Sequence, residues 1–164
     1  MPRYAENTEV GAERSRQEIE KTLQRYGARS FMYGFDEHRA MVMFAVHGRK
    51  VRFVLPVPDR EDKEFKWTNH DPPRRRTLKQ QEDAHEQAVR QRWRALNLVI
   101  KAKLEAVETG IVSFDAEFLA HLVLPNGSTV ADTAIPAVQL AYETNTMTSL
   151  LPDYDGPKSL TSSS

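Results

Sequence analysis

The chain has no cysteine among its 164 residues. This absence excludes disulfide bonds, thiolate nucleophiles and any zinc site held by cysteine. The seven glycines stand singly, so the sequence offers no glycine-rich loop for a phosphate and no dinucleotide-binding fingerprint. It also lacks an apolar run long enough for a membrane span or a secretory signal. We therefore expect a soluble intracellular protein that contacts no membrane.

Signals for catalysis are also scarce. The five histidines do not have the spacing of a metal site, and no serine lies in the Gly-x-Ser-x-Gly pattern of hydrolases. Adjacent acids stand beside turns or helix starts, where solvation and the helix dipole favour them. We expect no metal, no cofactor and no catalytic residue, and a binding protein rather than an enzyme. An enzyme that uses Glu105, Glu108 or Asp115 stays open as an alternative.

What the chain does have is a separation of charge that its formal net charge of zero conceals. Residues 74–103 hold nine lysines or arginines against three acids, whereas the residues after Lys103 hold eight acids against one lysine. A local surplus of positive charge is what a protein needs to hold a polyanion on one face. The charge pattern therefore indicates a binding surface.

The N-terminal half predicts a helix followed by a small sheet. Residues 1–11 lack periodicity and predict a flexible arm, whereas Ile19 and Leu23 recur at helical spacing within residues 12–26. Gly27 stands where a helix would take a left-handed cap. Three runs with a two-residue repeat then predict strands at residues 30–35, 39–47 and 50–57.

One long helix is predicted over residues 80–109. Its apolar residues step by threes and fours, and they are Val89, Trp93, Leu96, Ile100, Leu104 and Val107. Gly110 then ends the helix. The preceding residues 58–79 contain Pro72 and Pro73 and predict a long, mobile surface loop.

The C-terminal third predicts a small helical subdomain. A short helix over residues 114–121 leads to residues 125–128, whose Asn-Gly pair is typical of a type I′ hairpin turn. A last helix near residues 135–143 is expected to begin at Pro136, whose fixed φ suits a first turn. Residues 144–164 predict a mostly disordered tail.

These elements together predict an α+β fold. A three-stranded antiparallel meander is packed by the N-terminal helix and the long central helix, in a single domain over residues 12–143. The same order of elements occurs in double-stranded RNA-binding domains, and phage single-strand annealing proteins also build on a meander and a long helix. Many unrelated small domains share this order, so function has to be argued from residues.

The cations near the long helix define a candidate nucleic-acid site, which we call the basic ridge. Its members are Arg74, Arg75, Arg76, Lys79, Arg90, Arg94 and Lys101. The last three fall on one side of the predicted helix, beside the apolar stripe. Cations in such a line neutralise phosphates and release counterions, which gives affinity without reading of the sequence.

Other residues extend or compete with this hypothesis. Trp67 and either Tyr33 or Phe35 could stack on the bases of a single strand. Methionines in the predicted strands suit an adaptable binding surface, although core packing is the simpler interpretation. Alternatively, the ridge is a solvated surface whose arginines pair with the acidic C-terminal third, or it binds a protein partner. The opposite charges also allow self-association of two copies.

The sequence resembles a family of small uncharacterised proteins of tailed phages and prophages. The resemblance is carried by residues 25–34, 51–56, 90–108 and 114–127, and residues 92–108 are its most specific part. It implies a phage protein in the cytoplasm of a bacterial host, without an established activity. In this family the loop before the long helix is shortened or altered, which favours the helix cations over Arg74 to Arg76.

The sequence therefore predicts a small non-enzymatic phage protein that binds nucleic acid in DNA replication or recombination. The alternative is a phage-encoded factor or inhibitor that acts on a host or phage protein.

Overall fold

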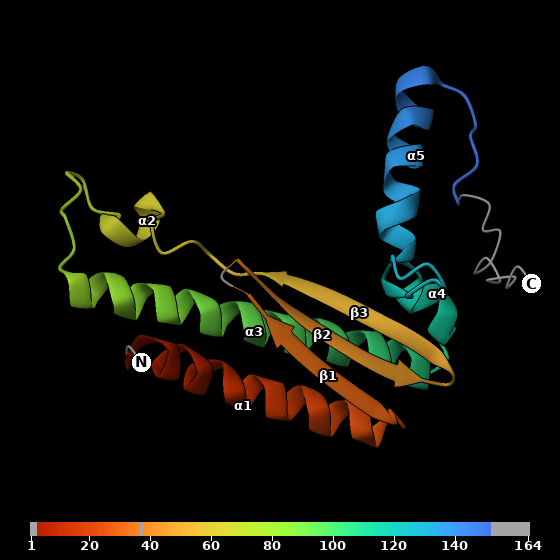
Figure 1. Ribbon diagram of the computed structural model, residues 1–164, viewed down its shortest axis with the longest axis horizontal. Helices are drawn as coiled ribbons and strands as arrows, with labels where there is room; N and C mark the ends of the chain where they lie inside the picture. The colour runs from red at the N-terminus through yellow and green to blue at the C-terminus, as the bar shows by residue number, and fades with distance from the viewer. Residues whose placement is uncertain (1–2, 37, 152–164) are drawn as a thin grey trace, which may run out of the picture.

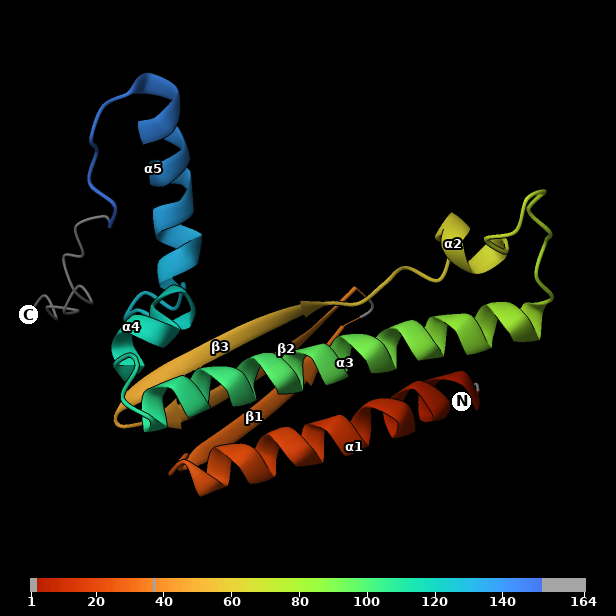
Figure 2. The same ribbon diagram turned by 180° about the vertical axis from the view of Figure 1, so that it is seen from behind.

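The computed structural model describes residues 3–36 and 38–151, with side chains from Ala12 onward. In chain order the elements are α1 (Arg3–Arg25), β1 (Ser30–Phe35), β2 (Arg39–Val46), β3 (Arg49–Pro56), α2 (Lys63–Lys66), α3 (Leu78–Glu108), α4 (Phe114–Phe118), the 3-10 helix η1 (Leu119–His121) and α5 (Val130–Thr144). Helices α1 and α3 lie side by side against one face of the sheet (Figures 1 and 2). The predicted α+β fold is confirmed.

Helix α1 begins earlier than the sequence predicted. Residues 3–11, which were expected to form a flexible arm, are helical and continuous with the predicted helix. Once a helix has formed, each further residue adds one backbone hydrogen bond without a new nucleation step. Residues 3–11 can therefore extend α1 without an apolar stripe of their own. At the other end, Gly27 has a φ of 86° and the Ala28 N–H donates to the Leu23 carbonyl. This is the predicted left-handed cap.

The sheet is the predicted antiparallel meander in the order β1-β2-β3. Its inner face is formed by alternate residues, and the buried ones are Ala40, Val42, Phe44, Val46, Val51, Phe53 and Leu55. His47 and Gly48 both have positive φ, as the type I′ turn between β2 and β3 requires. The two-residue turn fixes the register, and the register decides which residues face the helices.

Helix α3 supplies the other half of the core. Thr77 and Gln80 form a capping box at its start, which satisfies backbone N–H groups that the helix leaves unpaired. The predicted stripe is buried from Val89 to Leu104, and the Trp93 indole lies 5.4 Å from the Tyr33 ring. His85 extends this stripe one turn earlier than the sequence indicated.

The segment before α3, predicted as a long, mobile surface loop over residues 58–79, contains the short helix α2. Phe65 in α2 is only 4% exposed and packs edge-on against the His85 ring. An isolated bridge joins Trp67 to Arg75, so the chain turns back toward α3. These contacts anchor the segment because a buried aromatic ring holds it to the long helix.

The C-terminal part departs from the prediction at two points. Asn126 does not share the positive φ of Gly127, so the turn over residues 125–128 is not type I′. Helix α5 begins at Val130, because the Thr129 hydroxyl and the Asp132 carboxylate form a capping box there, and Pro136 lies inside the helix. α5 then rises away from the sheet and the other helices (Figure 1). Of the predicted tail, residues 152–164 lie outside the described residues.

Only one face of the sheet is covered by the described helices. Phe118 of α4 packs edge-on against Phe44 and Phe53, so α4 lies on the same face as α1 and α3. On the other face Met32 is 57% and Val54 is 54% exposed. None of the described helices is long and apolar enough to span a bilayer.

Candidate nucleic-acid interface

Three cations of the basic ridge form a cluster on α3. Arg90, Arg94 and Lys101 are exposed, and steps of four and seven residues return to the same side of a helix. At 1.5 Å per residue the three span roughly 17 Å along the axis. Within the described part of the chain, none of them has an ion pair with a carboxylate. Their charges therefore face solvent.

The other members of the ridge lie at the start of α3. Arg74 and Arg75 are exposed in the turn before the helix, and Lys79 is exposed in its first turn. Arg76 is different, because its half-buried guanidinium donates to the Glu64 carbonyl at 3.3 Å. Arg76 thus holds the loop to α2, while its three neighbours stay open to a ligand.

Two acids divide the ridge. Asp83 and Glu86 lie on the side of α3 that carries Lys79 and Arg90, at helical steps of three and four residues. The structure therefore brings the predicted residues together as two clusters along one helix rather than as one uninterrupted line. The first cluster is Arg74, Arg75 and Lys79, and the second is Arg90, Arg94 and Lys101.

The acidic C-terminal third pairs with other cations. Asp115 accepts two hydrogen bonds from the Arg49 guanidinium, each of 3.1 Å, and this interaction raises the pKa of Arg49. Glu117 accepts from the Lys103 ammonium at 2.9 Å, in a pair that is about three-quarters buried on both sides. These two acids are therefore not the partners of the ridge.

Asp132 is held in the same way. Its carboxylate accepts from the Thr129 backbone N–H at 2.9 Å and from the Arg52 guanidinium at 3.2 Å. The backbone donor, then the Thr129 hydroxyl and Arg52, hold the pKa of Asp132 below its usual value. Sequence reasoning missed all three pairings, because each joins residues that are distant in the chain.

The aromatic side chains proposed for stacking have different surroundings. Tyr33 is half-buried, stacked on Phe35 at 5.8 Å and covered by the Arg16 guanidinium at 4.1 Å. Phe35 is 61% exposed and Trp67 is 43% exposed. Phe35 and Trp67 therefore remain available to a base, whereas Tyr33 is part of the packing between α1 and the sheet.

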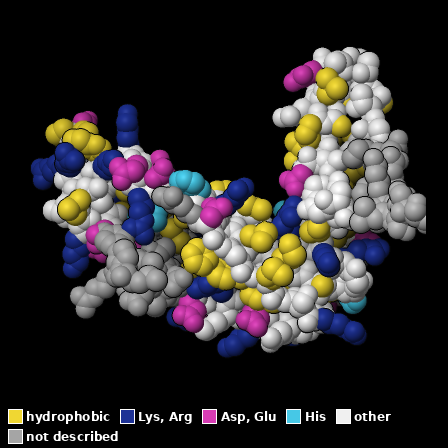
Figure 3. Space-filling model, viewed as in Figure 1, with side chains coloured by type: hydrophobic (Ala, Val, Ile, Leu, Met, Phe, Trp, Pro, Cys, Tyr) yellow, Lys and Arg dark blue, Asp and Glu magenta, His cyan; other side chains and the backbone are white. Residues whose placement is uncertain are grey.

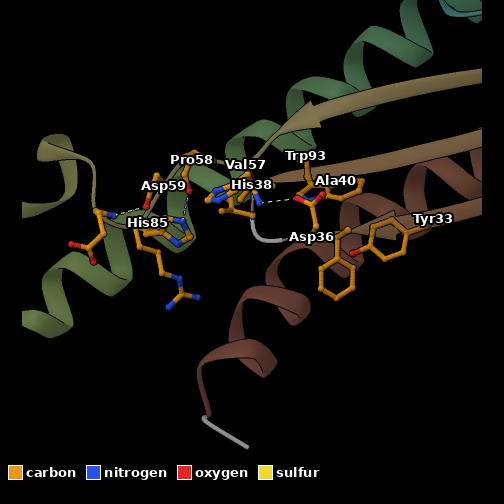
Figure 4. Close-up of a pocket in the computed structure, with 14 residues that line it drawn as sticks. Tyr33, Asp36, His38, Ala40, Val57, Pro58, Asp59, His85 and Trp93 are labelled. Carbon is orange, nitrogen blue, oxygen red and sulfur yellow. Dashed lines mark hydrogen bonds between the residues drawn. The ribbon is translucent and has the colours of Figure 1, made fainter. Parts of the chain in front are cut away.

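A cavity of about 390 Å³ lies where α3 passes the end of the sheet. Figure 4 shows Tyr33, Ala40, Val57 and Trp93 around it. The His85 Nε2 lies 2.8 Å from the Pro58 carbonyl, so this nitrogen is engaged by the chain itself.

The carboxylates of the cavity are also engaged. Asp36 accepts from the backbone N–H groups of His38 and Arg39, which lower its pKa together with the Arg39 guanidinium. Asp59 accepts from the Glu61 N–H. In the described residues no three metal-ligating side chains converge, here or elsewhere.

Comparisons with models of protein families, with curated proteins and with solved structures found no match.

Proposed function

We propose that the protein binds nucleic acid through the basic ridge, chiefly through Arg90, Arg94 and Lys101. The observation that supports this proposal is the distribution of ion pairs. Cations near the C-terminal acids are paired, whereas the three on α3 have no ion pair among the described residues. Exposed cations without intramolecular partners gain most from an external polyanion, since they lose no existing pair.

The geometry favours contact with the phosphate backbone rather than with base edges. Arg90 and Arg94 stand one helical turn apart, roughly 6 Å along the axis. Long arginine side chains at this spacing can reach phosphates of the same strand. Such contacts position a protein without selecting a sequence. The proposed setting is phage DNA replication or recombination. The resemblance in sequence suggests the phage, and the proposed binding of nucleic acid suggests the process.

The test is fluorescence anisotropy with labelled single-stranded and double-stranded oligonucleotides at low salt. We expect micromolar or tighter binding by the wild type and at least a tenfold loss in the triple variant Arg90→Gln, Arg94→Gln, Lys101→Gln. The matched control removes three other exposed cations, Lys21→Gln, Arg29→Gln and Arg92→Gln, and should retain binding. An equal loss in both triple variants would reject the site, and no binding by the wild type would reject the function.

A second candidate is an acidic protein of the host or the phage. It is favoured by Asp83 and Glu86, which interrupt the ridge and would repel a uniform polyanion. A protein partner can place its own cations opposite these acids and so gain specificity. If neither oligonucleotide binds, recovery of one partner by the wild type but not by the ridge variant in a pulldown supports this candidate.

A further inference from the structure

The open face of the sheet is an uncovered apolar surface. We define it by Met32, Met41, Met43, Ala45 and Val54, which the strand register brings side by side. The Met41 Cε lies 3.7 Å from the position that a Cβ of Gly34 would take, so Met41 lies over the glycine. Figure 3 shows apolar side chains gathered over the sheet on this face. Methionines adapt their shape to a partner, so this surface suits docking.

Helix α5 carries a second uncovered surface. None of its 15 residues is buried, although only Asp132 and Glu143 are charged. Ile135, Val138 and Tyr142 stand at positions i, i+3 and i+7 and are 54%, 38% and 86% exposed. We call these three residues the α5 stripe. This spacing is typical of a helix that docks on an apolar surface.

The base of α5 is fixed to the sheet of its own chain. The Arg52 guanidinium donates to the Gly127 carbonyl at 2.9 Å and to the Asp132 carboxylate at 3.2 Å. The capping box of Thr129 and the bridge between Val123 and Thr129 hold the first turn in place. To lie on its own open face, α5 would have to break these contacts. The α5 of the same chain therefore does not cover the open face.

We propose that the α5 stripe of one copy packs on the open face of a second copy. The dimensions agree, because a 15-residue helix is about 22 Å long and an eight-residue strand about 26 Å. The charges agree as well. The charged strand residues on the open face are Arg39, Lys50 and Arg52, whereas the charged residues of α5 are Asp132 and Glu143. Arg39 pairs with Asp36, and Arg52 pairs with Asp132 of its own chain. Lys50 and Glu143 have no ion pair among the described residues, so this pair carries the complementarity. Glu143 near the free end of α5 then has Lys50 of the second copy as a partner.

In the proposed dimer, each copy places its α5 on the open face of the other copy. A helix about 22 Å long and 10 Å wide covers roughly 220 Å² on the partner sheet. Counted on both partners, one such contact buries roughly 440 Å², whereas a stable complex buries about 1,200 Å² or more. Two copies that exchange their α5 helices double the contact and close the pair with two-fold symmetry. The resulting dimer is expected to be small and reversible.

The absence of cysteine makes cross-linking a direct test. One chain carries Val138→Cys on α5, and a second, ¹⁵N-labelled chain carries Met43→Cys on the open face. The two are mixed and treated with a short bismaleimide. The matched control replaces Met43→Cys by Leu98→Cys, because Leu98 is 60% exposed on α3 and away from the open face.

The proposal predicts a cross-linked species that contains one labelled and one unlabelled chain, with at least fivefold higher yield than the control. Three results would overturn it: a yield equal to the control, links between two Val138→Cys chains instead, or an intrachain link in the double-cysteine variant that persists at high dilution. The last two place α5 against another α5 or against its own sheet.

A second measurement does not depend on cross-linking. Light scattering should show a mass that rises toward a dimer as wild-type concentration increases. Val138→Lys should abolish the rise, because it places a cation against the cations of the open face, and it should not unfold the protein because Val138 is not buried. Leu98→Lys is the control and should behave as wild type. A monomeric wild type up to several hundred micromolar would reject the dimer.

Discussion

Ion pairs with single carboxylates determine which of the described lysines and arginines are neutralised within the chain. Asp115, Glu117 and Asp132 each hold a cation of the sheet or of α3 that lies outside the basic ridge. A ridge neutralised by the acidic third was an alternative on sequence grounds, and for these three acids the structure does not support it. They are equally unavailable for the predicted self-association through opposite charge patches. The local charge surplus of the ridge persists in the folded chain.

His121 should make the stability of the protein depend on pH. Its ring stacks on Phe53 at 4.0 Å, and burial, assisted by the nearby Lys103 ammonium, lowers its pKa from 6.5. The folded state therefore resists protonation, whereas the unfolded state takes up a proton below about pH 6.5. Stability should decrease as the pH falls from 7.5 through this range. Urea denaturation at several pH values measures this change in the free energy of unfolding.

The variant His121→Gln distinguishes the contribution of His121 to the pH dependence of stability from the contribution of the carboxylates. It should reduce the dependence of the unfolding free energy on pH between 7 and 5.5. An unchanged slope in the variant would show that His121 does not contribute.

Individual side-chain pairings could not be predicted from the sequence. Arg49 and Asp115 are 66 positions apart, and Arg52 and Asp132 are 80 apart. Nothing in local propensity or periodicity selects such partners. The exposure of Arg90, Arg94 and Lys101 was predictable, because it follows from the position of each residue relative to the apolar stripe of one helix.

Helix α4 attaches the C-terminal part to the core. Its Phe118 is fully buried, edge-on to Phe44 and Phe53 and stacked on Phe114 at 4.6 Å. Lys103 reaches from α3 to the Glu117 carbonyl and carboxylate of the same helix. This short helix therefore positions the chain that leads to α5.

Phe118→Ala should remove about 3–5 kcal/mol of stability, because it leaves a cavity between three aromatic rings. The neighbouring variant Leu119→Ala should cost far less, since Leu119 is 53% exposed. Urea denaturation of both variants measures the difference. Equal losses would contradict the role of Phe118 as the anchor of α4.

Elements with a strong apolar period were predicted well, whereas the start of α5 was not. Helix α3 was expected over residues 80–109 and spans Leu78–Glu108, because its stripe is continuous. The start of α5 was placed six residues too late. Pro136 was taken as its first turn, although Thr129 and Asp132 cap the helix upstream. The short strands were predicted because their alternation is regular from Arg39 to Pro56.

The two proposed surfaces lie on different sides of the molecule. The helix cluster of the ridge flanks the α3 stripe on the helical side, and the open face is on the other side of the sheet (Figures 2 and 3). A dimer formed through α5 would therefore leave the ridge of each copy exposed. Consequently, the ridge triple variant should dimerise like the wild type, and light scattering of that variant checks this independence. A monomeric ridge variant would show that the two surfaces are coupled.

The proposed role of Arg90, Arg94 and Lys101 is to neutralise phosphates. Its most direct test is the dependence of the dissociation constant on salt concentration, measured by anisotropy for the wild type and for the triple Gln variant. Removal of three phosphate contacts should lower the slope of log K against log salt by about two to three, because each contact contributes about 0.7 to 0.9. A variant that binds with the wild-type affinity and slope would show that these three residues do not contact phosphates.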